Sequence, residues 1–451
     1  MSSPIHVAIV GSGPSGFYAA DTLLKSGQPV LIDMFERLPT PFGLVRSGVA
    51  PDHQKLKQSI QVFEQIAGSP AFNFFGNVTI GEDIKVEELR QAYHAVIFAC
   101  GAQTDRRIGI SGEDLSGSHT ATEFVGWYNG HPDYRDRSFD LQQEVVAIIG
   151  QGNVAVDVCR ILTRPVDELR SSDIAEHALE ALSQSRVREV HVIGRRGPAQ
   201  AKFTTKELRE LASLTGVTAT IEPAQLRLSP VCETELAHPT ASNAKKNFDV
   251  FGSIAANVPA SDKRRIHFEF LASPIEIRGK DRVEGLTLIR NRLSGEAFSQ
   301  QAVATGDPFE LSCGLVFRSI GYRGEPIAGL PFDAVKGVLP NQRGRVGQDG
   351  APLGGIYVTG WLKRGPSGII GTNRADSIET VESILEDLGK ATVWEALGMA
   401  AIETTISGLR KKVVGLSDWR AIDAAEIERG AARGKPREKF TRIEEMLSCC
   451  P

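Results

Sequence analysis

The chain has 451 residues, of which 41% are hydrophobic and 24% are charged, so it has room for two or three globular domains with substantial cores. Its 51 basic and 55 acidic side chains leave a net charge of −4, which gives no argument for nucleic-acid binding. No signal-peptide pattern is visible near the start, and no apolar run approaches the ~20 residues that span a membrane. These features predict a cytoplasmic protein without a membrane span.

The six cysteines show neither a C-x-x-C pair nor a metal-ligand spacing with histidine. This pattern indicates a reducing compartment and argues against a thiol pair that carries electrons beside a cofactor. The last two, Cys449 and Cys450, are interpreted as solvent-exposed thiols and not as a redox pair.

An alternation of strand and helix opens the chain. The apolar run His6–Val10 predicts a strand, the residues from about Ser15 to Ser26 have a helical pattern, and Val30–Phe35 predicts a second strand. A β-α-β unit of this kind implies a parallel sheet with a right-handed crossover.

A glycine turn joins the first strand to the first helix, with the sequence Gly11-Ser12-Gly13-Pro14-Ser15-Gly16. In a G-x-G-x-x-G turn the glycines let the backbone approach a pyrophosphate, and the N–H groups of the following helix face the phosphates. Glu36 stands about twenty residues beyond the turn, where a ribose hydroxyl is bound. The pattern predicts a dinucleotide site with Gly11, Gly13, Gly16 and Glu36; the alternative is a purely structural turn.

A second β-α-β unit follows in the middle of the chain. Glu144–Ile149 and Glu189–Ile193 predict strands, and the residues from Asn153 to about Leu162 predict a helix. The turn between the first strand and the helix is Gly150-Gln151-Gly152-Asn153-Val154-Ala155, in which alanine replaces the third glycine, as the pattern allows.

The second unit differs from the first at the end of its later strand, where Arg195 and Arg196 replace the acidic residue. A carboxylate there favours a free ribose hydroxyl, whereas guanidinium groups suit a 2′-phosphate. The pair therefore favours NADP over NAD, and the alternative is solvated surface charge. Two dinucleotide sites in one chain imply transfer between a tightly held flavin and a diffusible nicotinamide.

The remaining regions predict further elements. Thr204 and Glu207 have capping-box spacing at the start of a helix that runs to about Ser213. The polar stretch Cys232–Ala260 is interpreted as surface loops with one helix near Lys245–Ile254, and the charged run Lys435–Lys439 as a solvated segment. Strands are expected at His267–Leu271, Gly285–Arg290, Leu315–Ile320 and Gly355–Gly360, and a helix from about Ala375 to Leu388.

Several long motifs resemble adrenodoxin reductase and the bacterial ferredoxin–NADP reductases similar to it. They are the stretch Pro41-Phe42-Gly43-Leu44-Val45-Arg46-Ser47-Gly48-Val49-Ala50-Pro51-Asp52-His53, Gly150–Asp157, Gly194–Pro198, Phe203–Glu210 and Gly360–Thr372. The resemblance runs from the N-terminus to about residue 380, and the last seventy residues add little to it.

The resemblance implies an α/β fold with two Rossmann-like domains, similar to glutathione reductase without its dimerisation domain. The FAD domain is expected to comprise residues 1–107 and 331–451, and the second of these segments includes a C-terminal helical region. The NADP domain is expected to comprise residues 108–330 and to be inserted within the FAD domain. A monomer is expected.

The resemblance also implies contacts for both cofactors. FAD contacts are expected from Ser15, Glu36, Leu44, Ile80, Trp361, Gly368, Ile369 and Ile370. NADP contacts are expected from Gln151, Gly152, Asn153, Val154, Arg195, Arg196, Glu207 and Gly368. Glu207 has the alternative role of a capping-box partner, and Trp361 that of a core residue.

His53 and Glu210 match a family pair near the flavin and the nicotinamide that has been considered to handle protons. A histidine suits the proton that accompanies a hydride step. The alternative is a loop histidine that only shapes the pocket.

The implied reaction is hydride transfer from NADPH to FAD, followed by single-electron transfer to a ferredoxin or an adrenodoxin-like iron–sulfur protein, with flavodoxin as another possible acceptor. Such a carrier could supply a cytochrome P450. A mature mitochondrial form fits the same sequence as a cytoplasmic protein. The alternatives are a flavin monooxygenase or diaphorase and a non-catalytic NADP(H)-binding flavoprotein subunit.

An acidic carrier would need a basic face near the NADP domain. The candidates are Arg209, Lys245, Lys246, Lys263, Arg264 and Arg265. For each of them, the alternative is an ordinary solvated charge on the surface.

Overall fold

The computed structural model describes residues 4–257, 263–348, 350–390 and 399–451. The chain divides into two compact units. Unit 1 comprises Met1–Thr104, Asn129–Pro132 and Gly321–Pro451, and unit 2 comprises Asp105–Tyr128 and Asp133–Ile320. The second unit is thus inserted into the first, with boundaries that differ from residues 107 and 330. The assignment of each domain to one cofactor stays a proposal.

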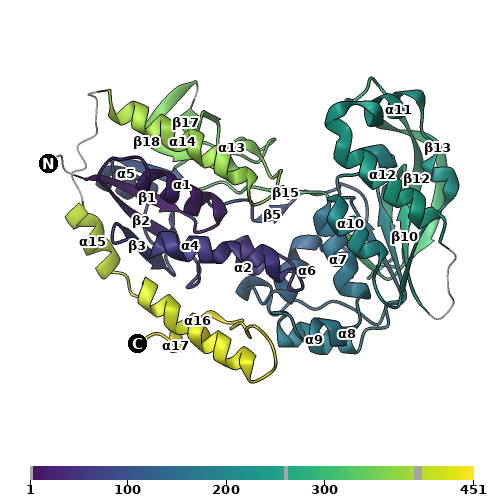
Figure 1. The fold of residues 1–451 in the computed structure, drawn as a ribbon, viewed down its shortest axis with the longest axis horizontal. Helices are drawn as coiled ribbons and strands as arrows, with labels where there is room; N and C mark the ends of the chain where they lie inside the picture. The colour runs from purple at the N-terminus through teal and green to yellow at the C-terminus, as the bar shows by residue number, and fades with distance from the viewer. Residues whose placement is uncertain (1–3, 258–262, 349, 391–398) are drawn as a thin grey trace. The chain divides into compact units, whose positions relative to one another are not determined.

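Unit 1 is built on a seven-stranded sheet in the order β16-β17-β18-β4-β1-β2-β3 (Figure 1). The strands from β18 to β3 pair in parallel, and β16, β17 and β18 pair antiparallel. The strands are β1 (Ile5–Val10), β2 (Val30–Glu36), β3 (Phe72–Gly76), β4 (Ala95–Phe98), β16 (Asn341–Gln342), β17 (Arg345–Gln348) and β18 (Ala351–Val358). The predicted strands at the N-terminus and before Gly360 are confirmed.

The central strands of this sheet are apolar along nearly their whole length, because helices and other segments pack on both faces. Helix α1 packs against α14, a helix from the far end of the sequence (Figure 1). The helices of unit 1 are α1 (Pro14–Leu24), α2 (Leu44–Ser47), α3 (Gln54–Lys57), α4 (Ser59–Ala67), α5 (Val86–Ala92), α13 (Trp361–Arg364), α14 (Thr372–Leu388), α15 (Met399–Ser407), α16 (Leu416–Ala431) and α17 (Ile443–Ser448).

Unit 2 contains a six-stranded parallel sheet in the order β6-β14-β7-β8-β10-β9 and a three-stranded antiparallel sheet in the order β11-β12-β13. The strands of the parallel sheet are β6 (Ser118–Thr120), β7 (Val145–Ile149), β8 (Glu189–Ile193), β9 (Val217–Ile221), β10 (Arg264–Glu269) and β14 (Leu315–Arg318). The antiparallel strands are β11 (Ala272–Arg278), β12 (Gly285–Ser294) and β13 (Gln301–Ser312). Two short strands, β5 (Thr104–Asp105) and β15 (Tyr322–Arg323), pair where the chain changes unit.

The helices of unit 2 are α6 (Ala121–Tyr128), α7 (Asn153–Thr163), α8 (Val166–Leu169), α9 (Glu176–Ser183), α10 (Thr205–Ala212), α11 (Pro230–Ala237) and α12 (Ser242–Ala255). The stretch Cys232–Ala260, whose residues 258–260 lie outside the described part of the chain, contains the predicted helix as α12. It also contributes to a second helix, α11, where surface loops are expected from the sequence. Because α11 buries Cys232 against its unit, the polar composition of this stretch reflects one exposed face and not an absence of structure.

Two expectations for the C-terminal region are wrong. Lys435 and Lys439 are buried, and so the charged run is not a solvated segment. Lys435 Nζ pairs with Glu438 at 2.7 Å, and Lys439 Nζ donates to the carbonyl of Asn129 at 2.9 Å. Cys449 and Cys450 are half-buried free thiols and not fully exposed ones.

In the part of the chain that the structure describes, no helix has the length and apolar character needed to cross a membrane.

Candidate functional site

The glycine turn of unit 1 lies between the end of β1 and the start of α1. Gly11 has φ +105°, and a Cβ atom there would stand 2.7 Å from the backbone of Ala99. A Cβ atom at Gly16 would stand 2.2 Å from the carbonyl oxygen of Gly11. At Gly13, by contrast, no atom lies within 4 Å of the Cβ position. The first and third glycines are therefore required by close packing, and the middle one leaves the backbone open to a ligand.

Glu36 lies at the end of β2 and turns its carboxylate toward the glycine turn. Its Oε2 accepts hydrogen bonds from the backbone N–H of Ser12 at 3.1 Å and from the Ser12 hydroxyl at 2.7 Å. Its Oε1 accepts from the N–H of Leu38 at 3.2 Å. The carboxylate is thus fixed in position, and its remaining lone pairs can accept a hydroxyl of a ribose.

The loop that begins the motif Pro41–His53 packs directly on this turn. The N–H of Phe42 donates to the carbonyl of Ser12 at 3.0 Å, and a Cβ at Gly43 would stand 3.0 Å from Gly13 Cα. Phe42 has φ +82°, a conformation that costs a non-glycine residue about 1–3 kcal/mol and persists only where the surroundings enforce it. Leu44, which follows Gly43, is 39% exposed, which leaves its side chain available to a ligand.

The C-terminal region holds that loop in place. Arg46, in α2, makes a bidentate ion pair with Glu426 of α16, with distances of 2.8 and 2.5 Å, and both side chains are buried. Burial alone raises the pKa of Glu426, but the charges of Arg46 and Arg437 outweigh burial and hold that pKa below its usual range. Trp419 packs edge-on against Phe42. These contacts could not be predicted from the sequence, because the partners are far apart along the chain.

A second loop, after β18, approaches α1. A Cβ at Gly360 would stand 2.0 Å from the hydroxyl of Ser15, so this strand end and the first turn of α1 are in close contact. Trp361 is half-buried, stacks on Tyr322 with ring centroids 5.2 Å apart, and donates its Nε1–H to the carbonyl of Ser367 at 3.2 Å. These interactions support a positioned indole and not one that fills the core.

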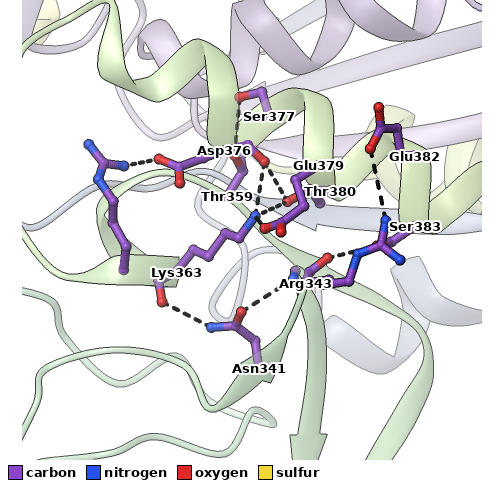
Figure 2. A network of polar contacts seen from close by, with 12 residues as sticks. Asn341, Arg343, Thr359, Lys363, Asp376, Ser377, Glu379, Thr380, Glu382 and Ser383 are labelled. Atoms are coloured by element: carbon purple, nitrogen blue, oxygen red, sulfur yellow. Dashed lines mark hydrogen bonds and ion pairs between the residues drawn. The ribbon is translucent and has the colours of Figure 1, made fainter.

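Polar contacts between α13 and α14 hold this second loop (Figure 2). Lys363, whose side chain is 7% exposed, pairs with Glu379 at 2.5 Å and donates to the carbonyl of Asp376 at 3.1 Å. Arg364 pairs with the Asp376 carboxylate. The loop between the two helices carries the expected contacts Gly368, Ile369 and Ile370; of these, Gly368 has φ +83° and Ile369 is 64% exposed. Ile80, another expected contact of unit 1, is half-buried.

The glycine turn of unit 2 repeats the geometry of the first turn. Gly150 has φ +134°, and a Cβ there would stand 2.1 Å from the carbonyl oxygen of Ser319. Gly152 is the N-cap of α7, and no atom lies within 4 Å of its Cβ position. Ala155 carries a Cβ at the third position and is fully buried. The open space again lies at the middle glycine, while Val154 is partly buried against the core.

Two side chains of this turn are held by neighbouring segments. Gln151 packs under Gly194, where a Cβ would stand 1.9 Å from its Oε1, and its Nε2 donates to the carbonyl of Glu269 at 3.3 Å. Asn153 Oδ1 accepts the N–H of Thr204 at 2.8 Å. Both residues therefore shape the turn.

Arg195 and Arg196 follow β8, as predicted. Their carbonyls accept hydrogen bonds from Asn291 Nδ2 at 2.9 Å and from the N–H of Leu271 at 3.1 Å. Arg195 is exposed and Arg196 half-buried. The backbone of the pair is thus anchored. Neither guanidinium makes an ion pair within the described residues, so both can bind a phosphate group.

Glu207 does not take part in the expected capping box. That motif needs the Thr204 N–H to bond to Glu207, but Asn153 takes that N–H, and Thr204 makes no side-chain capping bond. Burial raises the pKa of Glu207. Its Oε2 is buried without a hydrogen-bond partner among the described residues. An orphaned acceptor of this kind fits a contact to a bound ligand.

His53 and Glu210 lie in different units. His53 is the N-cap of α3, and its N–H donates to the carbonyl of Ala50 at 3.0 Å. Glu210, on α10, pairs with Arg164 at 3.2 Å. Their predicted pairing stays a proposal.

Comparison with known proteins identifies the family. Residues 5–215 match the model of the pyridine nucleotide-disulphide oxidoreductases. The chain is 45% identical over 464 residues to the mitochondrial NADPH:adrenodoxin oxidoreductase of Arabidopsis thaliana, covering 99% of this chain and 95% of that protein. It is 46% identical over 456 residues to NADPH-ferredoxin reductase FprA of Mycobacterium tuberculosis, covering 98% of each. The structure of FprA in complex with NADPH superposes with a TM-score of 0.93, at 45% identity and 99% coverage of both chains.

The chain belongs to the adrenodoxin reductase family. Membership in the adrenodoxin reductase family confirms the predicted α/β fold, the oxidoreductase class and the use of FAD with NADP(H). The open backbone at the middle glycine of each turn, the fixed Glu36 and the unpaired arginines fit these two groups. The match spans nearly the whole length, so it includes the last seventy residues, which the motifs alone did not identify.

Proposed function

We propose that this chain passes reducing equivalents from NADPH, through FAD, to a ferredoxin- or adrenodoxin-type iron–sulfur protein. The observation that carries the proposal is the contrast between the two glycine turns: one faces a fixed carboxylate, Glu36, and the other faces the unpaired guanidinium groups of Arg195 and Arg196. FAD and NADP(H) supply hydride acceptance and donation when bound. The protein supplies binding and orientation.

In this proposal the turn of unit 1 holds the FAD pyrophosphate at the start of α1, and Glu36 accepts a ribose hydroxyl. The other FAD residues are Gly11, Gly13, Ser15, Gly16, Leu44, Ile80, Trp361, Gly368, Ile369 and Ile370. The turn of unit 2 holds NADP(H) through Gln151, Gly152, Asn153, Val154, Arg195, Arg196 and Glu207. His53 and Glu210 are the proposed proton-handling residues.

The carrier is proposed to dock on exposed cations of unit 2. Arg209, Lys245, Lys246 and Lys263 are exposed and available. Arg264 and Arg265 are not, because Arg264 donates to the carbonyl of Thr163 at 3.0 Å and Arg265 pairs with Glu189. The docking face therefore consists of four residues in place of the six that the sequence suggested. A cytoplasmic monomer is part of the same proposal.

The deciding experiment measures NADPH oxidation by the purified protein with and without a [2Fe–2S] ferredoxin, after an absorption spectrum has established bound flavin. We expect ferredoxin reduction that depends on NADPH and falls steeply with added salt, because screening weakens charge-guided docking. A flavin monooxygenase would consume NADPH only with oxygen and a substrate. A non-catalytic flavoprotein would reduce neither ferredoxin nor an artificial dye, and either result would overturn the proposal.

A further inference from the structure

A cavity of about 280 Å³ lies in unit 2 beside Arg196. Its lining includes Arg196, Gln200, Lys202, Glu235, Phe298 and Gln300. The sequence motifs account for Arg196 alone among these residues. The cavity therefore brings a second cation, Lys202, to the side of the predicted phosphate-binding arginine.

Lys202 is attached to the glycine turn of unit 2. Lys202 forms a parallel β-bridge with Gly152, and its backbone N–H donates to the carbonyl of Gln151 at 3.0 Å. The backbone of Lys202 is thereby fixed beside the middle glycine, where the backbone is open to a ligand. Its side chain is exposed, so the ammonium group can move at the rim of the cavity.

The charge balance of the cavity favours an anion. Glu235 is the carboxylate among the lining residues, and its oxygens are already engaged by neutral donors. Gln200 Nε2 donates to Oε2 at 2.6 Å, while the N–H of Phe298 and Gln300 Nε2 donate to Oε1 at 2.5 and 3.0 Å. Glu235 therefore organises the wall of the cavity, and this single carboxylate is outnumbered by the two lining cations, Arg196 and Lys202.

No ion pair to a carboxylate is made by Arg195, Arg196 or Lys202 anywhere in the ranges that the structure describes. Three cations without counter-ions beside one glycine turn raise the local positive potential. The group that fits is a dianionic phosphate monoester attached to a nucleotide whose pyrophosphate lies on that turn. The 2′-phosphate of NADP(H) has this chemistry, and NAD(H) has a hydroxyl in its place.

We propose that Lys202 is a further specificity-determining residue of the NADP(H) site, which binds the 2′-phosphate together with Arg196. This inference rests on the proposed NADP(H) site in unit 2. A flexible ammonium group supplies charge without the fixed geometry of a guanidinium. Lys202 therefore strengthens selection of the phosphate, while Arg196 sets its position.

The test measures binding of two probes to the purified holoenzyme by calorimetry: 2′,5′-ADP, which carries the phosphate monoester, and 5′-ADP, which lacks it. We expect Lys202→Met to weaken 2′,5′-ADP binding about threefold to tenfold and to leave 5′-ADP binding unchanged, since one partly exposed ion pair is lost. Lys202→Arg should retain most of the affinity. The wild-type preference for 2′,5′-ADP should shrink at high salt, and it should shrink less in Lys202→Met.

Lys245→Met is the matched control, because Lys245 is an exposed lysine of the same unit that does not line the cavity. Equal affinities of wild type and Lys202→Met for 2′,5′-ADP, with a large loss in Arg196→Met, would overturn the inference and leave the proposed NADP(H) site intact. If Arg196→Met also binds 2′,5′-ADP as wild type does, the proposed site itself fails.

Discussion

The two glycine turns share a backbone and differ in how tightly they are built. In unit 1 a Cβ at the third position would stand 2.2 Å from the carbonyl oxygen of Gly11, so only glycine fits there. In unit 2 the third position is Ala155, whose Cβ is accommodated in the core. Phe42 and Gly360 pack against the first turn, and the segment Lys202–Thr204 bonds to the second turn.

The residues at the strand ends that follow the two turns also differ in how firmly they are held. Glu36 is bonded to the turn it serves, whereas Arg195 and Arg196 are held only by their backbones. A preorganised site loses little entropy on binding and suits a cofactor that stays bound; a site with unpaired mobile cations suits one that comes and goes. In the proposed function, the same local motif therefore serves a tightly bound cofactor in unit 1 and a diffusible one in unit 2, and the surrounding residues make the difference.

The largest effect is expected when the third residues of the two turns are exchanged. Gly16→Ala forces a Cβ against the Gly11 carbonyl, so we expect loss of more than about 4 kcal/mol and protein with little bound flavin. Ala155→Gly should cost only about 1 kcal/mol, the ordinary helix penalty of glycine. Flavin absorbance per chain measures the bound flavin, and urea unfolding measures the stability of each variant. Equal effects in the two variants would show that the two turns do not differ at their third positions.

The next test concerns the ion pair that supports the first turn. Glu426→Ala leaves the buried guanidinium of Arg46 without its carboxylate, which should cost about 3–5 kcal/mol and weaken flavin retention. Glu428→Ala, an exposed neighbour on α16, is the control and should change stability by less than about 0.5 kcal/mol. Thermal unfolding followed by flavin fluorescence distinguishes the two. Unchanged flavin release in Glu426→Ala would show that the C-terminal region does not support the turn.

Removing a cation from the second turn should affect binding and leave the first turn unchanged. Arg196→Met should raise the Kd for NADP+ by about 20-fold to 100-fold, or about 2–3 kcal/mol, because a charge-assisted contact to phosphate is lost. The flavin spectrum should stay as in wild type. Arg209→Met, on α10, is the control for a general change in charge. Loss of flavin from Arg196→Met would contradict the independence of the two turns.

The smallest expected effect is a pH dependence confined to unit 2. Burial, with help from His267, lowers the pKa of His191 to about 4. Since the unfolded chain binds a proton there below about pH 6.5, stability falls as the pH drops from 6.5 toward 4, by roughly 2 kcal/mol at pH 5. His191→Gln should lose less stability than wild type between pH 8 and pH 5 in urea unfolding. His238→Gln, at an exposed position, should keep the full dependence.

Much of the site could be predicted from local patterns. The two turns, Glu36 and the Arg195–Arg196 pair lie within short β-α-β units, where spacing along the chain fixes spacing in the fold. The capping box of Thr204 and Glu207 failed because Asn153, from another helix, takes the N–H that the motif needs. Spacing alone cannot reveal such a competitor.

Long-range contacts could not be predicted from the sequence for the same physical reason. The run Lys435–Lys439 has the composition of a solvated segment, and only a partner far away in the sequence, the carbonyl of Asn129, explains why Lys439 is buried. The pairing of Arg46 with Glu426 likewise depends on tertiary structure and not on periodicity. Buried charges are therefore the features that composition misjudges most readily in this chain.

The ion pair between Arg46 and Glu426 also has a consequence for the order of events during synthesis. Its two residues are 380 positions apart, so Arg46 is translated long before Glu426. Unit 2 ends at Ile320, between the two, so every residue it needs is translated before Glu426. The first glycine turn therefore gains this support only after the whole of unit 2 has been made.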